Sequence, residues 1–171
     1  MKNAFLILLL SAIYFTANAQ TRGRNATSRS ATSSGFSIGL EAGLPVGENG
    51  EIYSSIIGGS LQYEIMPAAD LGITFSGGYL NYNIKSKYGG GSVGFVPLLA
   101  GVKYYFTPGA FFHAQLGAAV GTKTGQRTSF AYSPGVGLKL SPNLDAEVKY
   151  MGISNKGGTI PNVGLRVAYN F

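Results

Sequence analysis

The chain has 171 residues, a formal net charge of +6 and no cysteine. The lack of cysteine excludes disulfides, thiolate metal sites and a lipid anchor attached through a cysteine. The bases are scattered along the chain rather than gathered on one face, which argues against a nucleic-acid-binding protein. Glycine is frequent at 26 residues, and the chain carries 11 Tyr and 10 Phe but no Trp. This composition favours an all-β protein with closely packed backbones.

The N-terminal region has the features of an export signal. Lys2 precedes an apolar run from Ala4 to Phe15, and Ala17-Asn18-Ala19 is a small-x-small cleavage site. The run is shorter than the ~20 apolar residues that a membrane-spanning helix needs. We therefore predict a cleaved signal peptide over residues 1–19. Residues 20–34 are rich in Ser, Thr, Arg and Ala without periodicity, which predicts a disordered polar segment.

From residue 35 onward, apolar residues alternate with small or polar ones in eight segments. These segments span residues 36–44, 56–66, 71–82, 93–106, 110–121, 130–140, 144–151 and 163–171. Short connections occupy 66–70, 107–109 and 141–143. Longer polar connections occupy 45–53, 85–92, 122–129 and 152–161. Strands joined alternately by short turns and long loops predict an all-β, eight-stranded antiparallel up-and-down barrel over residues 35–171, with both ends at the short turns.

Three observations predict that this barrel is transmembrane, with its apolar face outward. The alternate face carries mainly Gly, Ser and Thr, which suits the narrow lumen of an eight-stranded barrel. Aromatic residues collect near both ends of the apolar face, as they do at membrane interfaces. The inward face also balances its charges, because four acids match four bases: Glu41, Glu64, Asp145 and Glu147 with Lys103, Lys139, Lys149 and Arg166. We predict that these eight residues form a paired network that plugs the lumen.

The last segment alternates Val163, Leu165, Val167, Tyr169 and Phe171 with small or polar residues. It resembles the terminal strand of bacterial outer-membrane β-barrels, whose last residue is typically Phe. The region from residue 35 to 171 resembles the OmpA/OmpX-like family of small eight-stranded outer-membrane barrels. The segments at residues 96–106 and 134–138 are similar to those of porin-family barrels common in Bacteroidota. The resemblance implies an outer-membrane location in a Gram-negative bacterium, and no periplasmic peptidoglycan-binding domain is expected after Phe171.

Pro97 and Pro134 fall inside two of the predicted strands. Proline cannot donate to a β-ladder, and a closed barrel has no free edge. We expect bulges or frayed pairing at both positions.

Two features suggest chemistry, and neither predicts an enzyme. The stretch Gly117–Thr124 resembles a phosphate loop, but Thr122 stands where that motif needs Gly, and no helix is expected after it. His113 is the only histidine. Some small outer-membrane barrels modify lipid A with a His near the outer leaflet. His113 is expected near the short turns instead, bonded to a lumen neighbour such as Gln115 or Lys103. No catalytic residue, cofactor or metal is predicted.

The expected function is structural or interactive, as in envelope integrity, adhesion or membership of an outer-membrane assembly. A narrow porin-like channel for small solutes is the alternative. Bases outnumber acids in the long loops, with Lys85, Lys87, Lys123, Arg127 and Lys156 against Glu48 and Glu51. We expect these loops to contact outer-membrane lipid and lipopolysaccharide, or a protein partner in that membrane, and no nucleic acid.

Overall fold

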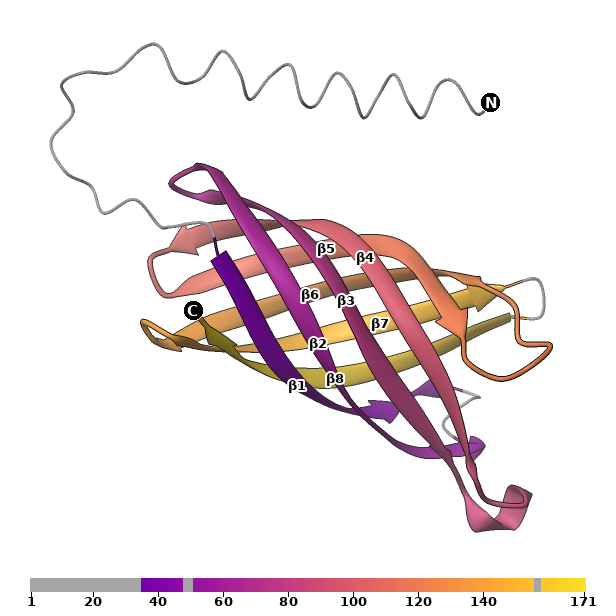
Figure 1. The fold of residues 1–171 in the computed structure, drawn as a ribbon. Helices are drawn as coiled ribbons and strands as arrows, with labels where there is room; N and C mark the ends of the chain where they lie inside the picture. The colour runs from indigo at the N-terminus through magenta and orange to yellow at the C-terminus, as the bar shows by residue number, and fades with distance from the viewer. Residues whose placement is uncertain (1–34, 48–50, 156–157) are drawn as a thin grey trace, which may run out of the picture. The chain divides into compact units, whose positions relative to one another are not determined.

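The computed structural model describes residues 35–47, 51–155 and 158–171, so the predicted signal peptide and polar segment lie outside the described residues. Eight strands form a closed barrel in which each strand pairs antiparallel with the next and β1 pairs with β8 (Figure 1). This confirms the predicted fold class. The elements are β1 (Gly35–Pro45), β2 (Tyr53–Ala68), β3 (Leu71–Ile84), the 3-10 helix η3 (Ser86–Tyr88), β4 (Ser92–Thr107), β5 (Ala110–Gly121), β6 (Ser129–Ser141), β7 (Leu144–Asn155) and β8 (Gly158–Asn170). No helix among the described residues is long and apolar enough to cross a membrane.

The strand boundaries differ from prediction mainly in the last hairpin. Residues 152–161 were expected to form one of the longer polar loops. Instead, β7 and β8 continue to pair through Gly152↔Pro161 and Ile153↔Ile160. Ile153 is fully buried in the barrel interior, so its packing stabilises this extension against the local preference for a turn.

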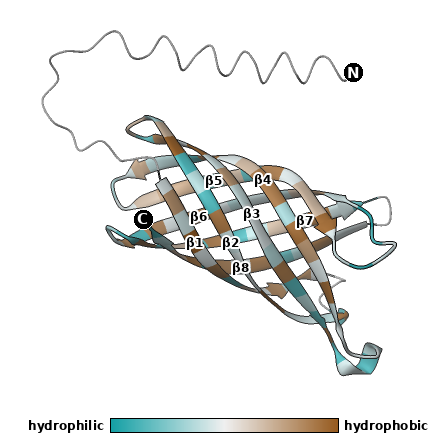
Figure 2. Cartoon of the chain, in the orientation of Figure 1, coloured by the Kyte–Doolittle hydropathy of each residue, from teal (hydrophilic) through white to brown (hydrophobic). Residues whose placement is uncertain are grey.

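The apolar face points outward, as predicted. Leu40, Leu116 and Leu138 are 77%, 61% and 56% exposed, whereas the adjacent Glu41 and Gln115 are buried. Apolar and polar residues follow one another along the strands (Figure 2). Aromatic side chains pack against each other at both ends of this wall. The pairs near the short turns are Phe36–Tyr63, Phe106–Phe112 and Tyr169–Phe171, and those near the long loops are Phe130–Tyr132 and Tyr132–Tyr150.

Each proline interrupts the pairing of its strand with one neighbouring strand and leaves the pairing with the other neighbour intact. The β3–β4 register skips from Gly77↔Leu98 to Leu80↔Phe95 around Pro97. The β6–β7 register likewise skips two pairs around Pro134. Each proline stays paired with β5 on its other side. The expected fraying is thus confirmed, while the register shifts that mark bulges lie near the strand ends instead.

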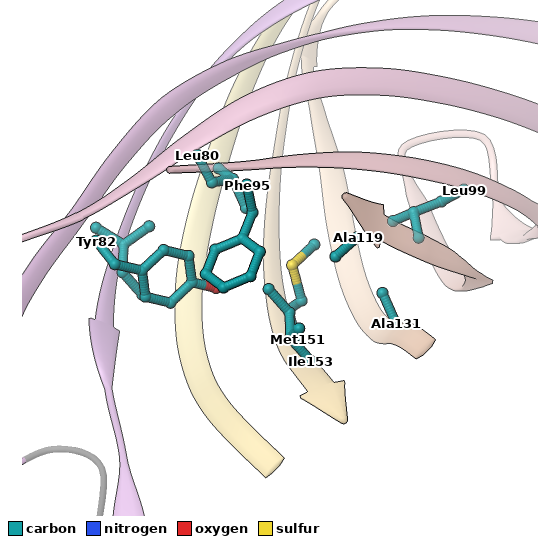
Figure 3. Close-up of a cluster of buried hydrophobic side chains, with 9 residues drawn as sticks. Leu80, Tyr82, Phe95, Leu99, Ala119, Ala131, Met151 and Ile153 are labelled. Carbon is teal, nitrogen blue, oxygen red and sulfur yellow. The ribbon is translucent and has the colours of Figure 1, made fainter. Parts of the chain in front are cut away.

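An apolar cluster fills the lumen toward the long loops, and we name it the apolar stopper. Its buried members are Ile56, Leu80, Tyr82, Phe95, Leu99, Ala119, Ala131, Met151 and Ile153 (Figure 3). The Tyr82 ring stands edge-on to Phe95 at 5.4 Å, and its hydroxyl accepts a 2.9 Å hydrogen bond from Asn162 Nδ2. The expectation of a mainly small inward face was therefore wrong for this half. Here, large apolar side chains pack on one another across the lumen.

The stopper should contribute substantially to stability. Replacing Ile153, which is fully buried, with Ala should lower the free energy of unfolding by about 2–5 kcal/mol. Ile52→Ala is the matched control, because Ile52 is 38% exposed in a loop and its loss should cost no more than about 0.5 kcal/mol. Urea unfolding in detergent micelles, followed by Tyr fluorescence, measures both. Equal costs for the two variants would contradict the packing described.

Candidate functional site

The polar half of the lumen, next to the short turns, contains a continuous chain of ion pairs. Lys103 Nζ lies 3.3 Å from Glu64 Oε2 and 3.8 Å from Asp145 Oδ2. Arg166 bridges Asp145 and Glu41 at 3.8 and 3.9 Å. Lys149 Nζ then pairs with Glu41 Oε2 at 2.7 Å. Acids and bases therefore alternate along a chain of six residues: Glu64, Lys103, Asp145, Arg166, Glu41 and Lys149.

Three of these ion pairs connect strands that are not neighbours in the sheet, namely those of Lys103 with Glu64 and Asp145 and that of Lys149 with Glu41. Lys103 on β4 reaches Asp145 on β7, which lies three strands away around the barrel. Lys149 on β7 reaches Glu41 on β1, with β8 between them. A charge buried in a low-dielectric interior is costly unless it is paired. This series of ion pairs therefore connects strands on different sides of the barrel wall across the lumen.

Neutral groups supply several hydrogen bonds to these charges, whereas Arg166 Nη1 and Asp145 Oδ1, which lie 3.8 Å apart, have no hydrogen-bond partner among the described residues. Arg166 Nε donates to Ser60 Oγ at 3.0 Å, and its Nη2 donates to Ser37 Oγ at 3.1 Å. The Tyr105 hydroxyl donates to Glu64 Oε1 at 2.7 Å, and Asn170 Nδ2 donates to Asp145 Oδ2 at 3.1 Å. Serines on β1 and β2 thus hold the guanidinium in a fixed orientation between its two acids.

Glu147 joins a second interaction, with His113 and Thr74. His113 Nδ1 lies 3.0 Å from both carboxylate oxygens of Glu147, and His113 Nε2 lies 3.0 Å from Thr74 Oγ1. The predicted histidine partners were wrong, because Gln115 donates to Ser76 instead and Lys103 pairs with acids. The sequence could not identify Thr74 or Glu147 as partners, since β3, β5 and β7 meet only across the lumen.

A hydroxyl, an imidazole and a carboxylate in this order are the components of a nucleophilic catalytic site. Thr74, His113 and Glu147 are, however, only 0%, 2% and 1% exposed. The three side chains join β3, β5 and β7 across the lumen.

Glycine provides the space for these long side chains. A Cβ at Gly39 would lie 2.6 Å from Arg166 Nε, and one at Gly135 would lie 2.7 Å from Glu147 Oε1. At Gly72 a Cβ would overlap the Glu64 carboxylate. The small inward residues and the charged ones are thus two parts of one arrangement.

Lys139, like Glu147, is a predicted network member that lies outside the six-residue chain of ion pairs. Among the ion pairs of the described residues, none includes it, and its Nζ lies 4.9 Å from the centre of the Tyr105 ring. Lys139 is half-buried beside the short turn that follows β6. This position lets its ammonium group contact an aromatic face in place of a carboxylate.

A cavity of about 10 Å³ borders Glu41, Lys149, Met151 and Asn162, which is about the space that one water molecule requires. In the described part of the chain, no group of three or more His, Asp or Glu residues could hold a metal ion. The Gly117–Thr124 stretch lies in β5 and the loop after it, so it forms no phosphate-binding helix start.

The long loops carry the exposed bases. Lys87, Lys123 and Arg127 are exposed, and Lys85 is half-buried. Lys87 Nζ lies 4.8 Å from the centre of the Tyr88 ring at the tip of the β3–β4 hairpin. Glu48 and Lys156, also assigned to these loops from the sequence, lie outside the described residues.

Comparison with known proteins identifies the fold. No protein-family profile matches the sequence, and no curated protein matches it. The outer-membrane protein Ail of Yersinia pestis, in a phospholipid bilayer nanodisc, is similar at a TM-score of 0.59 and 20% identity over 81% of this chain and 100% of that chain. Ail in complex with the heparin analogue sucrose octasulfate gives a TM-score of 0.57 and 22% identity over 81% of this chain and 97% of that chain. A de novo designed transmembrane β-barrel gives a TM-score of 0.57 and 18% identity over 80% of this chain and 95% of that chain. The chain thus shares the fold of small eight-stranded outer-membrane barrels.

The chain of ion pairs predicts the effect of removing its best-connected base. Arg166→Ala leaves Glu41 and Asp145 without the charge between them and should reduce the free energy of unfolding by about 3–5 kcal/mol. Unfolding in detergent measures the change. Arg127→Ala removes an exposed arginine and should leave stability nearly unchanged. If Arg166→Ala unfolds at the same urea concentration as the unmodified protein, the network does not stabilise the barrel.

Proposed function

We propose that the protein is an integral β-barrel of a bacterial outer membrane, exported with a cleaved signal peptide. Its role would be structural or interactive, in envelope integrity, adhesion or an outer-membrane assembly. The supporting observation is the inverted burial, in which large apolar side chains lie outside and paired charges lie inside. The finer resemblance to Bacteroidota porin-family barrels rests on residues 96–106 and 134–138 alone.

The exposed apolar side chains of the outer wall suit the hydrocarbon interior of a bilayer. The apolar band includes Leu40, Ile57 and Leu61, all more than half exposed. Soluble monomers rarely expose contiguous apolar patches above ~600 Å², because each buried Å² of such surface is worth about 25 cal/mol. A closed barrel also pairs its backbone N–H and C=O groups between strands, as the interior of a membrane requires.

The contents of the lumen argue against the porin-like alternative. Eight strands enclose a space that side chains can fill. In this barrel the ion-pair chain occupies one half and the apolar stopper the other. The burial of Thr74, His113 and Glu147 argues in the same way against an enzyme. We therefore propose a barrel that neither conducts solutes nor catalyses a reaction.

The exposed surface for interaction would be the long-loop end. In outer-membrane barrels the longer loops are extracellular, and there Lys87, Lys123 and Arg127 would face anionic sugars and phosphates. The structure of Ail with sucrose octasulfate supports this proposal by analogy of fold, since that ligand is a polyanion. Lipopolysaccharide or a sulfated surface glycan would present the same chemistry to these loops.

Membrane insertion without conductance is the first expected result. In the outer-membrane fraction, the unheated protein should migrate differently from the boiled protein in a detergent gel, because a closed barrel resists detergent. The purified protein should then give no steady current in planar bilayers. Recovery from the soluble periplasm without a mobility shift would refute the membrane proposal, whereas steady single-channel steps would favour the channel.

Polyanion binding by the loops is the second expected result. Replacing Lys87, Lys123 and Arg127 with Glu should abolish retention on immobilised heparin at low salt. Raising the salt concentration should release the unmodified protein, since exposed charges are screened beyond ~10 Å at 0.1 M. The matched control replaces Lys87 and Lys123 with Arg, which keeps the charge and should keep the binding. Equal retention of both variants would show that these loops do not bind polyanions.

A further inference from the structure

The outer wall over β6, β7 and β8 contains a groove of about 450 Å³. It is lined by Phe106, Val136, Gly137, Leu138, Ala146, Val148 and Leu165. No charged or hydrogen-bonding side chain is among these residues. The wall is therefore hollowed here between large outward side chains such as Phe106 and Leu138.

The strand register explains the hollow. Leu138 on β6 pairs with Ala146 on β7, and the next outward pair is Val136 with Val148. Ala146 thus places a single methyl group among longer outward side chains. Gly137 lines the groove with its backbone, since a Cβ there would point into the lumen at the Phe111 ring. On the opposite side, the Phe106 ring stands beside Phe112 with centroids 4.7 Å apart and forms one wall of the groove.

The size and chemistry of the groove determine what it can hold. Its volume falls within the ~300–1,000 Å³ of small-molecule sites. A stable protein interface involves about 20–30 residues on each side, many more than line this groove. A methylene group is similar in size to a water molecule at ~30 Å³, so the groove has room for about 15 of them. These properties suit one extended hydrocarbon chain better than the side of another protein.

We propose that the groove binds a single acyl chain of a membrane phospholipid. The proposal rests on the membrane location proposed above. Leu138 pairs with Ala110, next to the short turn after β4, whereas the aromatic pair Tyr132–Tyr150 marks the opposite end of the wall. The groove therefore faces the leaflet on the short-turn side, which is periplasmic in outer-membrane barrels and is formed by phospholipid. Because its lining is apolar, it selects for the hydrocarbon chain and not for the headgroup.

Photo-crosslinking in a bilayer tests the proposal. The full-length protein is placed in nanodiscs of phosphatidylethanolamine and phosphatidylglycerol that contain a phosphatidylcholine with a diazirine in its acyl chain. After illumination, mass spectrometry maps the lipid adducts. We expect adducts at residues 136–148 to exceed several-fold those at the outward residues of β2 and β3 on the opposite wall.

Substitutions then connect the adducts to the groove. Ala146→Trp fills the groove and should remove the excess at residues 136–148, and Ala146→Leu should reduce it. Ala100→Trp is the matched control, because Ala100 is also an exposed outward alanine, on β4, and is not part of the lining. The gel mobility shift shows whether each variant is folded. If Ala146→Trp does not fold, Ala146→Leu and the adduct map of the unmodified protein decide the outcome.

Two results would overturn the proposal. Adducts spread evenly around the wall would show that the groove holds no chain in preference to the rest of the surface. Crosslinks between two protein copies through residues 136–148 would show that a second copy occupies it. Failure of the membrane proposal itself would be recognised separately, since the unmodified protein would then show no mobility shift and would not enter nanodiscs.

Discussion

Charges enclosed in a narrow lumen must be paired, and most features of this barrel follow from that requirement. A buried carboxylate or ammonium without a partner costs several kcal/mol, on the order of half the total stability of a domain. In the lumen, each of the six residues in the ion-pair series has an oppositely charged neighbour within 4 Å: Glu64, Lys103, Asp145, Arg166, Glu41 and Lys149. These pairs exist only at one register of the strands, because a shift by a single residue would turn each charge toward the outer wall. The network therefore specifies the register as well as the interior.

The lumen has two layers, one stabilised by ion pairs and the other by apolar packing. In the polar layer, glycines such as Gly39 and Gly72 leave space for the guanidinium and carboxylate groups of their neighbours. In the apolar stopper, aromatic and aliphatic side chains pack as they do in the core of a soluble protein. The stopper lies toward the long loops and so separates the ion pairs from that end of the barrel. Such separation keeps the effective dielectric constant around the charges low and their attraction strong.

Much of this arrangement was predictable because it depends on local alternation. The eight strands, the outward apolar face and the inward position of the charged residues follow from which residues share a face. What alternation cannot show is contact across the lumen. The pairing of His113 with Thr74 and Glu147 joins strands that are distant in sequence. The stopper was missed because the alternation changes near the long loops. In β3 the apolar Leu80 and Tyr82 face inward and Asn81 and Asn83 face the other way, and in β4 both faces carry apolar residues. Lys139 was assigned to the correct face, but its contact with Tyr105 depends on its exact height in the barrel.

The claim that paired lumen charges stabilise the closed barrel is tested most directly by the coupling energy between Glu41 and Lys149. Their side chains are 2.7 Å apart and join β1 to β7 across β8. A double-mutant cycle would combine Glu41→Gln with Lys149→Met and measure urea unfolding in detergent for all four proteins. Residues in one ion-pair network are expected to show an interaction energy of about 0.5–3 kcal/mol. A value in that range would confirm that paired charges stabilise the closed barrel, and strictly additive effects would contradict it.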